Sequence, residues 1–237
     1  MSLRSELLSE RDAQFLPARP PASGRRNDGR SALRAVPGWW LTAKRLTDVA
    51  ISGVLLVVCL PVFVLAAAAI RIASPGPALF MQTRVGKSGR HFRLLKFRTM
   101  FDGAHLLHHH VAHLNECDGP ALKIVDDPRM HSLGAFLRRA SIDELPQLWN
   151  VLRGDMSLVG PRPALPHEVA TYERCYLRRL RVMPGITGLW QVSGRASVPF
   201  QRWMAMDLWY VRHWSPLVDL WLLLRTIPAV LRRDGAW

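Results

Sequence analysis

Residues 49–70 read VAISGVLLVVCLPVFVLAAAAI and contain no charged side chain. A straight helix of this length reaches about 33 Å at about 1.5 Å per residue, which is enough to cross the hydrocarbon core of a bilayer. Pro61 lies near the middle of the run, where it removes a helical hydrogen bond and bends the axis. The run therefore predicts a membrane helix that is bent at Pro61.

Basic residues flank this run on both sides. Lys44 and Arg45 precede it, and residues 71–98 carry Lys and Arg but no Asp or Glu. Positive charge marks the cytoplasmic side of a membrane. Charge at both ends therefore fits a re-entrant helix that enters, bends and leaves by the same face. The alternative is an ordinary single-pass anchor whose proline is tolerated.

Composition narrows the class of protein. The 237 residues are 49% hydrophobic and 21% charged, which excludes a disordered protein and allows one or two domains with a real core. The formal net charge of +14 predicts an anionic partner: nucleic acid, anionic lipid or a phosphorylated substrate. Nine Trp against three Tyr is typical of a membrane interface. Three scattered Cys favour a reducing compartment over a disulfide framework.

Local patterns beyond the apolar run predict a hairpin and several helices. Two short apolar stretches, 78–82 and 91–97, surround a turn at 86–89, which predicts a β-hairpin. The helical periodicity that begins at Leu133 ends at Gly154. The pattern as a whole indicates an α+β fold that is mainly helical, with a re-entrant membrane helix, a small β-hairpin unit and amphipathic surface helices.

Two aromatic or apolar stretches stand near the C-terminus. Residues 200–214 carry Trp203, Trp209 and Trp214 beside two Arg, and residues 217–230 are nearly apolar. These stretches suit helices that lie on a membrane with Trp and Arg at headgroup depth. Packed core helices are the alternative for either stretch.

A histidine cluster occupies residues 105–113. His105, His109 and His113 share one face of a helix, which leaves a metal site open. No carboxylate or Cys joins them at a suitable spacing, so the sequence favours a solvated helix or loop.

Asp143 and Glu144 are adjacent acids at the start of a predicted helix. Ser141 and Glu144 can form a capping box, and Asp143 suits the positive end of the helix dipole, which would make both acids structural. The functional alternative is a site for a metal–phosphate complex, or a carboxylate that attacks phosphorus. It rests on the nearby arginines, which are Arg138, Arg139, Arg153 and Arg162.

Two further segments hold cations. In Gly160-Pro161-Arg162-Pro163 a single Arg stands between two prolines in a rigid extended loop, and a preorganised guanidinium suits phosphate. An ordinary proline turn with a surface Arg fits this segment equally well. Lys96 and Arg98 end the predicted hairpin, where they either bind anions or protect an exposed edge strand from pairing.

In their order along the chain, these motifs resemble the monotopic phosphoglycosyl transferases, bacterial sugar transferases that start exopolysaccharide, capsule or O-antigen assembly. The matching motifs are KRLTD (44–48), SPGP (74–77), RVG (84–86), KFRTM (96–100), DDPR (126–129), DELPQLWNVLRGDMSLVGPRP (143–163) and PGITG (184–188). The resemblance runs from about residue 44 to the C-terminus. The polytopic N-terminal module of larger relatives has no counterpart, so we expect a minimal catalytic form.

The resemblance implies a reaction and roles for individual residues. A sugar 1-phosphate passes from a UDP-sugar to polyprenyl (undecaprenyl) phosphate and UMP leaves, which is the first membrane step of polysaccharide assembly. Asp143 would be the nucleophile that forms a covalent aspartyl-phosphosugar intermediate, and Glu144 would bind Mg²⁺ together with Asp143. Phosphate would be held by Arg162, Lys96, Arg98, Arg138 and the loop residues Pro161 and Pro163. The re-entrant helix of the family, broken near a proline, favours a hairpin at Pro61, although Leu60 stands where the family often has Ser.

Composition and the resemblance together give an expected place to each part of the chain. Residues 1–37, rich in Pro, Gly and Arg, are expected to be a flexible basic tail. Residues 38–71 would form an amphipathic lead-in and the re-entrant helix. Residues 72–237 would form a catalytic domain with membrane-surface helices, facing the cytoplasm at the bacterial inner membrane.

The expected partners are a UDP-sugar, a polyprenyl phosphate and membrane lipid, with no nucleic acid. Glucose and galactose fit the donor, N-acetylated and deoxy sugars stay open, and so does a homo-oligomer. The rival interpretation is a membrane-anchored protein that binds nucleic acid or anionic lipid through its Arg-rich surface. It gives Asp143 no special role.

Overall fold

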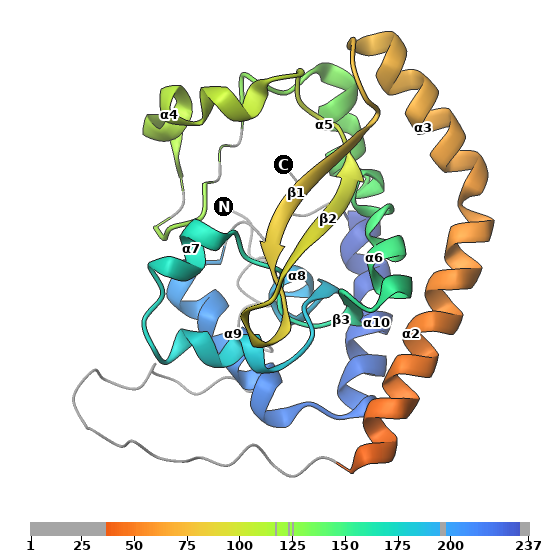
Figure 1. Cartoon of the computed structure of the whole chain (residues 1–237), viewed down its shortest axis with the longest axis vertical. Coiled ribbons are helices and arrows are strands. Elements are labelled where there is room, and N and C mark those ends of the chain that lie inside the picture. The colour runs from red at the N-terminus through yellow and green to blue at the C-terminus, as the bar shows by residue number, and fades with distance from the viewer. Residues whose placement is uncertain (1–36, 117, 123, 125, 195–197, 233–237) are drawn as a thin grey trace.

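The structure is a computed structural model that describes residues 37–116, 118–122, 124, 126–194 and 198–232. The predicted tail at 1–37 therefore lies outside the described residues except for Pro37. The described chain is mainly helical, with two small two-stranded sheets. Figure 1 shows two long helices along one edge, with the hairpin and the shorter elements beside them.

The apolar run forms a bent pair of helices, α2 (Gly38–Val58) and α3 (Leu60–Ala73). The two axes differ in direction by 59°. Pro61 lies in the first turn of α3, where its missing N–H is not needed, so the chain bends just before the proline. Among the described residues no single helix is long and apolar enough to cross a membrane, whereas this bent pair meets that test together. The predicted bend is confirmed.

The predicted hairpin is also confirmed. Strands β1 (Leu79–Val85) and β2 (His91–Phe97) pair antiparallel from Leu79–Phe97 at one end to Val85–His91 at the other. The turn between them contains the short 3-10 element η1 (Lys87–Gly89), in which Ser88 is left-handed with φ 57°. The register places Phe80 opposite Lys96 and Arg84 opposite Phe92. Because strand side chains alternate, these four residues share one face.

A second sheet was not expected from the sequence. Strands β3 (Ser157–Val159) and β4 (Gly185–Thr187) are parallel neighbours. Their backbones approach closely, since a Cβ added to Gly185 would stand 2.1 Å from the Gly160 nitrogen. Glycine is therefore required at this contact, which fixes the start of the loop from Gly160 to Pro163.

The rest of the described chain forms short helices on either side of β3 and two longer helices at the C-terminal end. Before β3 the chain forms α5 (Ser132–Arg139), the 3-10 turn η4 (Ile142–Glu144) and α6 (Gln147–Arg153). After β3 it forms α7 (Pro166–Ala170), η5 (Tyr176–Arg181), α8 (Leu189–Val192), α9 (Phe200–His213) and α10 (Pro216–Arg232). Gly154 ends α6 in the left-handed region at φ 87°, as the sequence predicted.

The histidine segment forms three short pieces, η2 (Ala104–Leu107), α4 (His108–Val111) and η3 (Ala112–Leu114). The expected single helical face is therefore not present. His109, His110 and His113 are exposed, which fits the solvated segment that the sequence favoured. Among the described residues, no group of three or more His, Cys, Asp or Glu could hold a metal ion.

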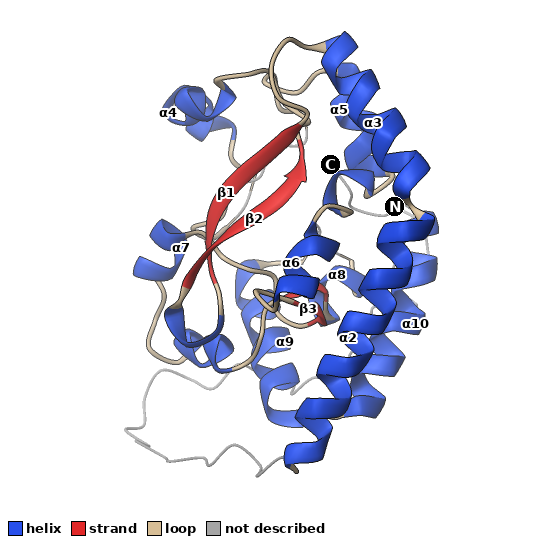
Figure 2. Cartoon of the chain, turned by 45° about the vertical axis from the view of Figure 1, so that its right-hand side comes forward, coloured by secondary structure: helices blue, strands red, loops and turns tan. Residues whose placement is uncertain are grey.

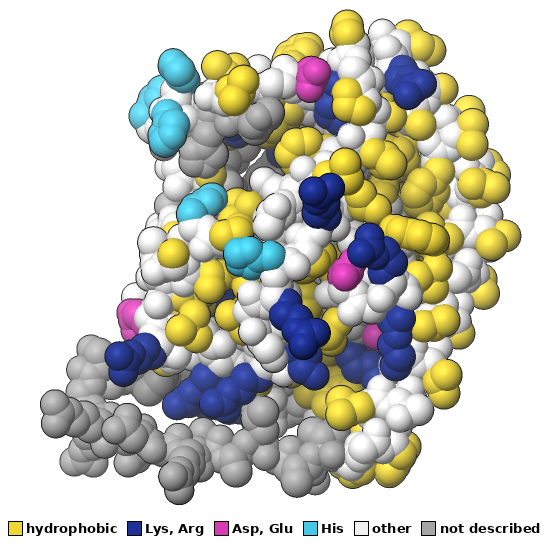
Figure 3. Space-filling model, viewed as in Figure 1, with side chains coloured by type: hydrophobic (Ala, Val, Ile, Leu, Met, Phe, Trp, Pro, Cys, Tyr) yellow, Lys and Arg dark blue, Asp and Glu magenta, His cyan; other side chains and the backbone are white. Residues whose placement is uncertain are grey.

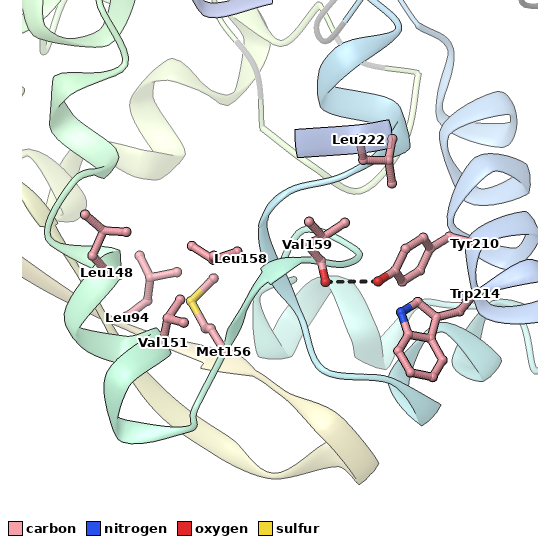
Figure 4. Packing of buried hydrophobic residues seen from close by; sticks show 9 residues of the cluster. All are labelled: Leu94, Leu148, Val151, Met156, Leu158, Val159, Tyr210, Trp214 and Leu222. Atoms are coloured by element: carbon pink, nitrogen blue, oxygen red, sulfur yellow. Dashed lines mark hydrogen bonds between the residues drawn. The ribbon is translucent and has the colours of Figure 1, made fainter. Parts of the chain in front are cut away.

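The largest core cluster joins the hairpin to both C-terminal helices (Figure 4). Its buried members come from β2, α6, β3, α9, α10 and two residues just outside these elements, Met156 and Trp214. They are Leu94, Leu148, Val151, Met156, Leu158, Val159, Tyr210, Trp214 and Leu222. Helix α9 is thus a core helix rather than a surface one, because six of its side chains are buried. Helix α10 keeps a long exposed apolar face and lies beside α2 in both ribbon views (Figure 2).

Polar contacts lock α2 onto this core. Lys44 donates to Asp219 at 2.5 Å and to the carbonyl of Val159 at 3.0 Å. Arg45 donates to the carbonyls of Val151 and Leu152 in the last turn of α6, at 2.6 and 2.7 Å. Asp48 is buried and accepts hydrogen bonds at the start of β3. The basic residues that the sequence presented as membrane flanks are therefore tertiary contacts as well.

Candidate active site

Asp143 lies in η4, the single 3-10 turn between α5 and α6, and is 7% exposed. The capping-box interpretation is wrong. Ser141 is left-handed with φ 56° and makes no side-chain cap hydrogen bond, and α6 begins only at Gln147. The two acids thus stand on a separate turn ahead of the helix.

Three cations from three elements surround the Asp143 carboxylate: Lys96 from β2, Arg138 from α5 and Arg162 from the loop after β3. Burial and the neighbouring Glu144 nevertheless raise the pKa of Asp143 to about 6, against the opposing effect of these cations. Within the described part of the chain, no hydrogen bond reaches this carboxylate. It is therefore a buried, weakly satisfied acid beside positive charge.

Lys96 has the complementary shift. Burial, and after it the charge of Arg138, lowers the pKa of Lys96 to about 7, although Asp143 opposes the change. Its Nζ lies 5.4 Å from the centre of the Phe80 ring across the hairpin. The strand is held in place by Asn150 of α6, whose amide bonds the backbone of Leu95 at 2.9 Å and of Arg93 at 2.8 Å. Asn150 thereby fixes the strand that carries Lys96.

Glu144 and Arg162 form the direct ion pair of the site, with 2.8 Å between Oε1 and Nη1. Burial opposes the charge of Arg162, but Glu144 and Asp143 raise its pKa overall. Each carbonyl of the Pro161-Arg162-Pro163 segment accepts a hydrogen bond, from Gly185, Arg179 and Arg84 respectively. The loop is therefore fixed as predicted, and it presents its guanidinium to Glu144.

The structure brings together Asp143, Glu144, Lys96, Arg138 and Arg162, but not Arg98. Arg98 is buried, and its guanidinium donates to the carbonyls of Ser74 and Pro75 at 2.6 Å each. It fastens the end of the hairpin to the end of α3. A Cβ on Gly76, which has φ 111°, would stand 2.4 Å from this guanidinium, so the SPGP turn needs glycine there.

Arg84 is a site residue to which the sequence interpretation gave no role. It donates to the Pro163 carbonyl at 3.0 Å and to Gln82 at 2.6 Å. Burial and the charge of Arg162 lower its pKa to about 10. The strand alternation that places Arg84 on the Lys96 face was a signal that could have found it.

The donor set fits Mg²⁺ in one particular way. Mg²⁺ prefers oxygen ligands and is commonly held by one or two carboxylates together with substrate phosphates. Asp143 and Glu144 supply adjacent carboxylates, whereas the described residues offer no third acidic or His ligand. The surrounding cations also favour phosphate. The residues therefore fit an ion that shares its coordination with a phosphorylated substrate.

The site is thus a buried carboxylate beside the cations of Lys96, Arg138 and Arg162. Residues 39–233 match the bacterial sugar transferase family, and the chain belongs to that family. It is 39% identical over 210 residues to the exopolysaccharide production protein ExoY of Rhizobium meliloti, covering 87% of this chain and 92% of that protein. The resemblance of the sequence motifs is thus confirmed.

Two further relatives carry names that describe a donor sugar. The chain is 45% identical over 204 residues to the UDP-glucose:undecaprenyl-phosphate glucose-1-phosphate transferase of Caulobacter vibrioides, covering 82% of this chain and 72% of that protein. It is 43% identical over 197 residues to the galactosyl transferase CpsE of Streptococcus agalactiae, covering 83% of this chain but 44% of CpsE.

Proposed function

We propose that the chain transfers a sugar 1-phosphate from a UDP-sugar to undecaprenyl phosphate and releases UMP. The observation that carries this proposal is the buried Asp143 carboxylate among Lys96, Arg138 and Arg162. Family membership and the names of the relatives support the same reaction. Glucose and galactose are the favoured donor sugars, since relatives are named for each.

The reaction proceeds in two displacements at the β-phosphorus of the donor. A carboxylate oxygen of Asp143 attacks this phosphorus, the bond to the oxygen that bridges to the α-phosphate breaks, and UMP leaves with the electron pair. A phosphate oxygen of the acceptor lipid then attacks the same phosphorus. The aspartyl–phosphorus bond breaks and the Asp143 carboxylate is restored. No proton needs to move in either displacement.

The surroundings of the two acids assign their roles. Asp143 has a pKa of about 6, so it is mostly ionised at neutral pH and still more nucleophilic than an ordinary carboxylate. Glu144 forms an ion pair with Arg162, and this ion pair orients the Arg162 guanidinium. The three cations stabilise the negative charge that two phosphates bring together. Mg²⁺, held by Glu144 and Asp143 when bound, would neutralise further phosphate charge.

An apolar outer surface supports a site at a membrane. On α10 the exposed apolar side chains recur at helical spacing: Leu217, Leu220, Leu224, Ile227 and Leu231, each more than half exposed. Figure 3 shows hydrophobic side chains gathered over α2 and α3 along the right-hand edge. Contiguous exposed apolar surface of this kind marks a membrane or partner contact.

The packing of the bent pair supports a re-entrant arm. Asp48 and Ser52 of α2 are buried, as are Ala66 and Ile70 of α3, so both ends of the arm rest on one folded body. Among residues 53–65 no side chain is buried. This stretch gives a helical path of only about 20 Å at about 1.5 Å per residue, with a bend inside it, whereas the hydrocarbon core is about 30 Å thick. The arm is thus suited to enter one leaflet and return, which leaves the catalytic body on the cytoplasmic face of the bacterial inner membrane.

The test of the reaction is UMP release by the purified full chain with undecaprenyl phosphate, Mg²⁺ and a panel of UDP-sugars. We expect release with UDP-glucose or UDP-galactose, with loss of activity on chelation. Asp143→Asn serves as the inactive control. Normal UMP release by folded Asp143→Asn would contradict the nucleophile, and no release from any donor would favour the binding-protein interpretation.

Topology has a separate test in a chain without its native cysteines. Single cysteines placed at Trp39 and Arg90, both exposed, report the two sides of the arm. We expect both to react with an impermeant thiol reagent only from the cytoplasmic side. Labelling from opposite sides would contradict the re-entrant arm without affecting the chemistry.

A further inference from the structure

Two groups outside the catalytic cluster hold Arg162. Its carbonyl accepts a hydrogen bond from Nη2 of Arg179 at 2.7 Å. Its guanidinium carbon lies 6.0 Å from the ring centre of Trp190 of α8, within reach of a cation–π contact. The first contact fixes the backbone, and the second supports the side chain in addition to its ion pair with Glu144.

The two supports are connected to each other. Trp190 stacks on Trp203 of α9, with ring centres 4.3 Å apart and planes inclined by 17°. The guanidinium carbon of Arg179 lies 5.6 Å from the Trp203 ring. The Arg162 guanidinium thus contacts Trp190, Trp190 stacks on Trp203, and Trp203 contacts Arg179. Arg179 in turn donates to the Arg162 carbonyl, so the contacts form a closed ring.

Arg179 is itself firmly anchored. Its Nη2 lies 2.7 Å from Oδ2 of Asp207, and the side chains of both residues are only 2% exposed. Its Nη1 donates to the Tyr172 hydroxyl at 3.0 Å. Moving either side chain away would leave an uncompensated charge in the interior, so the two side chains hold each other in place. Arg179 therefore supports Arg162 from a fixed position inside the protein.

We propose that Trp190 and the Arg179–Asp207 pair are positioning residues that hold the Arg162 guanidinium in place for the phosphates of the UDP-sugar. The inference rests on the proposed function and adds residues to which that function gave no role. A free arginine side chain samples many rotamers, and ordering it in advance avoids that entropy cost on binding. A misplacement of about 1 Å in such a group can cost about a hundredfold in rate.

The direct test compares Trp190→Ala with Trp190→Phe in the full chain. We expect kcat/KM for UDP-glucose or UDP-galactose, whichever is the donor, to fall by about tenfold to a hundredfold in Trp190→Ala. Trp190→Phe keeps an aromatic face and is expected to restore most of this loss. Trp221→Ala is the matched control, because it removes a similar contact on α10, where the Arg225 guanidinium carbon lies 4.9 Å from the centre of the Trp221 ring. This variant should leave kcat/KM unchanged.

A double-mutant cycle with Arg162→Ala separates positioning from folding. If Trp190 acts through Arg162, Trp190→Ala costs nothing further once Arg162 is gone, whereas a general structural defect costs the same factor in both backgrounds. Asp207→Asn, which removes the charge but keeps the shape, is expected to follow the same rule. An equal loss in both backgrounds, or no loss in Trp190→Ala, would overturn the inference.

The same cycle is measured by calorimetric titration with UDP, which keeps the two proposals apart. Donor binding with a Trp190–Arg162 coupling but without turnover would overturn the proposed reaction and leave the positioning role supported. Turnover that depends on Asp143, without that coupling, would overturn the positioning role alone. A wild-type chain that neither binds UDP nor turns over would overturn both.

Discussion

Two buried aspartates, Asp219 and Asp143, have opposite surroundings. Asp219 accepts hydrogen bonds from the Tyr210 hydroxyl at 2.7 Å, from Lys44 at 2.5 Å and from the Trp214 indole at 3.0 Å. Asp143 receives none from the described residues, and its neighbours act on it through charge alone. One acid is fully satisfied by the fold, and the other is left for a ligand to satisfy.

On the proposed mechanism, the difference distinguishes a carboxylate that stabilises the fold from one that reacts. Asp219 joins α2, β3, α9 and α10, because Lys44 and Tyr210 also donate to the Val159 carbonyl. Figure 4 shows the hydrogen bond from Tyr210 to Val159. Buried charges that are paired and hydrogen-bonded in this way cost little and specify one packing. Asp143 carries a raised pKa, which is a cost to folding that active sites commonly bear.

The largest expected effect is on turnover at Asp143. Asp143→Asn should lower kcat for UMP release by at least about a thousandfold, because the variant cannot form the aspartyl intermediate. The thermal unfolding midpoint should not fall. If activity and the midpoint fell together, Asp143 would resemble Asp219 and the comparison would fail.

Asp219→Asn should show the opposite pattern. It leaves the Lys44 ammonium, whose side chain is 13% exposed, without its carboxylate partner. We expect a loss of about 3 kcal/mol, which lowers the unfolding midpoint by about 6 to 12 °C in a chain of this size. The kcat of the folded fraction should stay near that of the wild type, as measured after a centrifugation step that removes aggregate. A stable but inactive variant would contradict this role.

Stability should also depend on pH differently in the wild type and Asp143→Asn. The pKa of Asp143 is raised in the folded state, so ionisation favours the unfolded chain. The Asn variant should therefore be more stable by about 3 kcal/mol well above pH 6, and this advantage should disappear as the pH falls from about 6 towards 3.8. Denaturant unfolding at several pH values measures it. A constant difference across this range would show that Asp143 does not titrate as described.

The smallest expected effect is the shape of the pH–rate profile. Below about pH 6, kcat/KM should fall by about tenfold per pH unit as Asp143 becomes protonated, and above about 7 it should fall as Lys96 loses its charge. Lys96→Arg keeps a positive charge at high pH, so it should remove the alkaline limb whatever its absolute rate. An unchanged alkaline limb in that variant would exclude Lys96 as its source.

Features encoded over a few neighbouring residues could be predicted from the sequence. The bend before Pro61, the hairpin and the end of α6 at Gly154 follow from local steric and hydrogen-bonding rules. The capping box failed because Ser141 adopts a left-handed conformation that only the fold dictates. The sequence did not predict the β3–β4 pair, because each strand has only three residues and its partner is distant in the sequence.

In the candidate site, too, the features that depend on contacts distant in the sequence could not be predicted from the sequence. The sequence offered Arg162 only as one of four arginines near the acid pair, because 19 positions of chain separate it from Asp143 and no periodic pattern places them together. The resemblance was needed to give Arg162 a phosphate-binding role. Arg98 was expected to bind phosphate, but its guanidinium is engaged with backbone carbonyls that no sequence pattern reveals. Lys44 and Arg45 looked like membrane flanks because their buried partners lie more than 100 residues away.

The most direct test of the account is to trap the aspartyl intermediate. The full chain is mixed with the UDP-sugar it uses and no acceptor lipid, and digested peptides are examined by mass spectrometry. The account predicts one hexose phosphate on Asp143, one equivalent of UMP, loss of the adduct when undecaprenyl phosphate is added, and no adduct in Asp143→Asn. An adduct on another residue, or UMP release that requires both substrates at once and leaves no adduct, would contradict it.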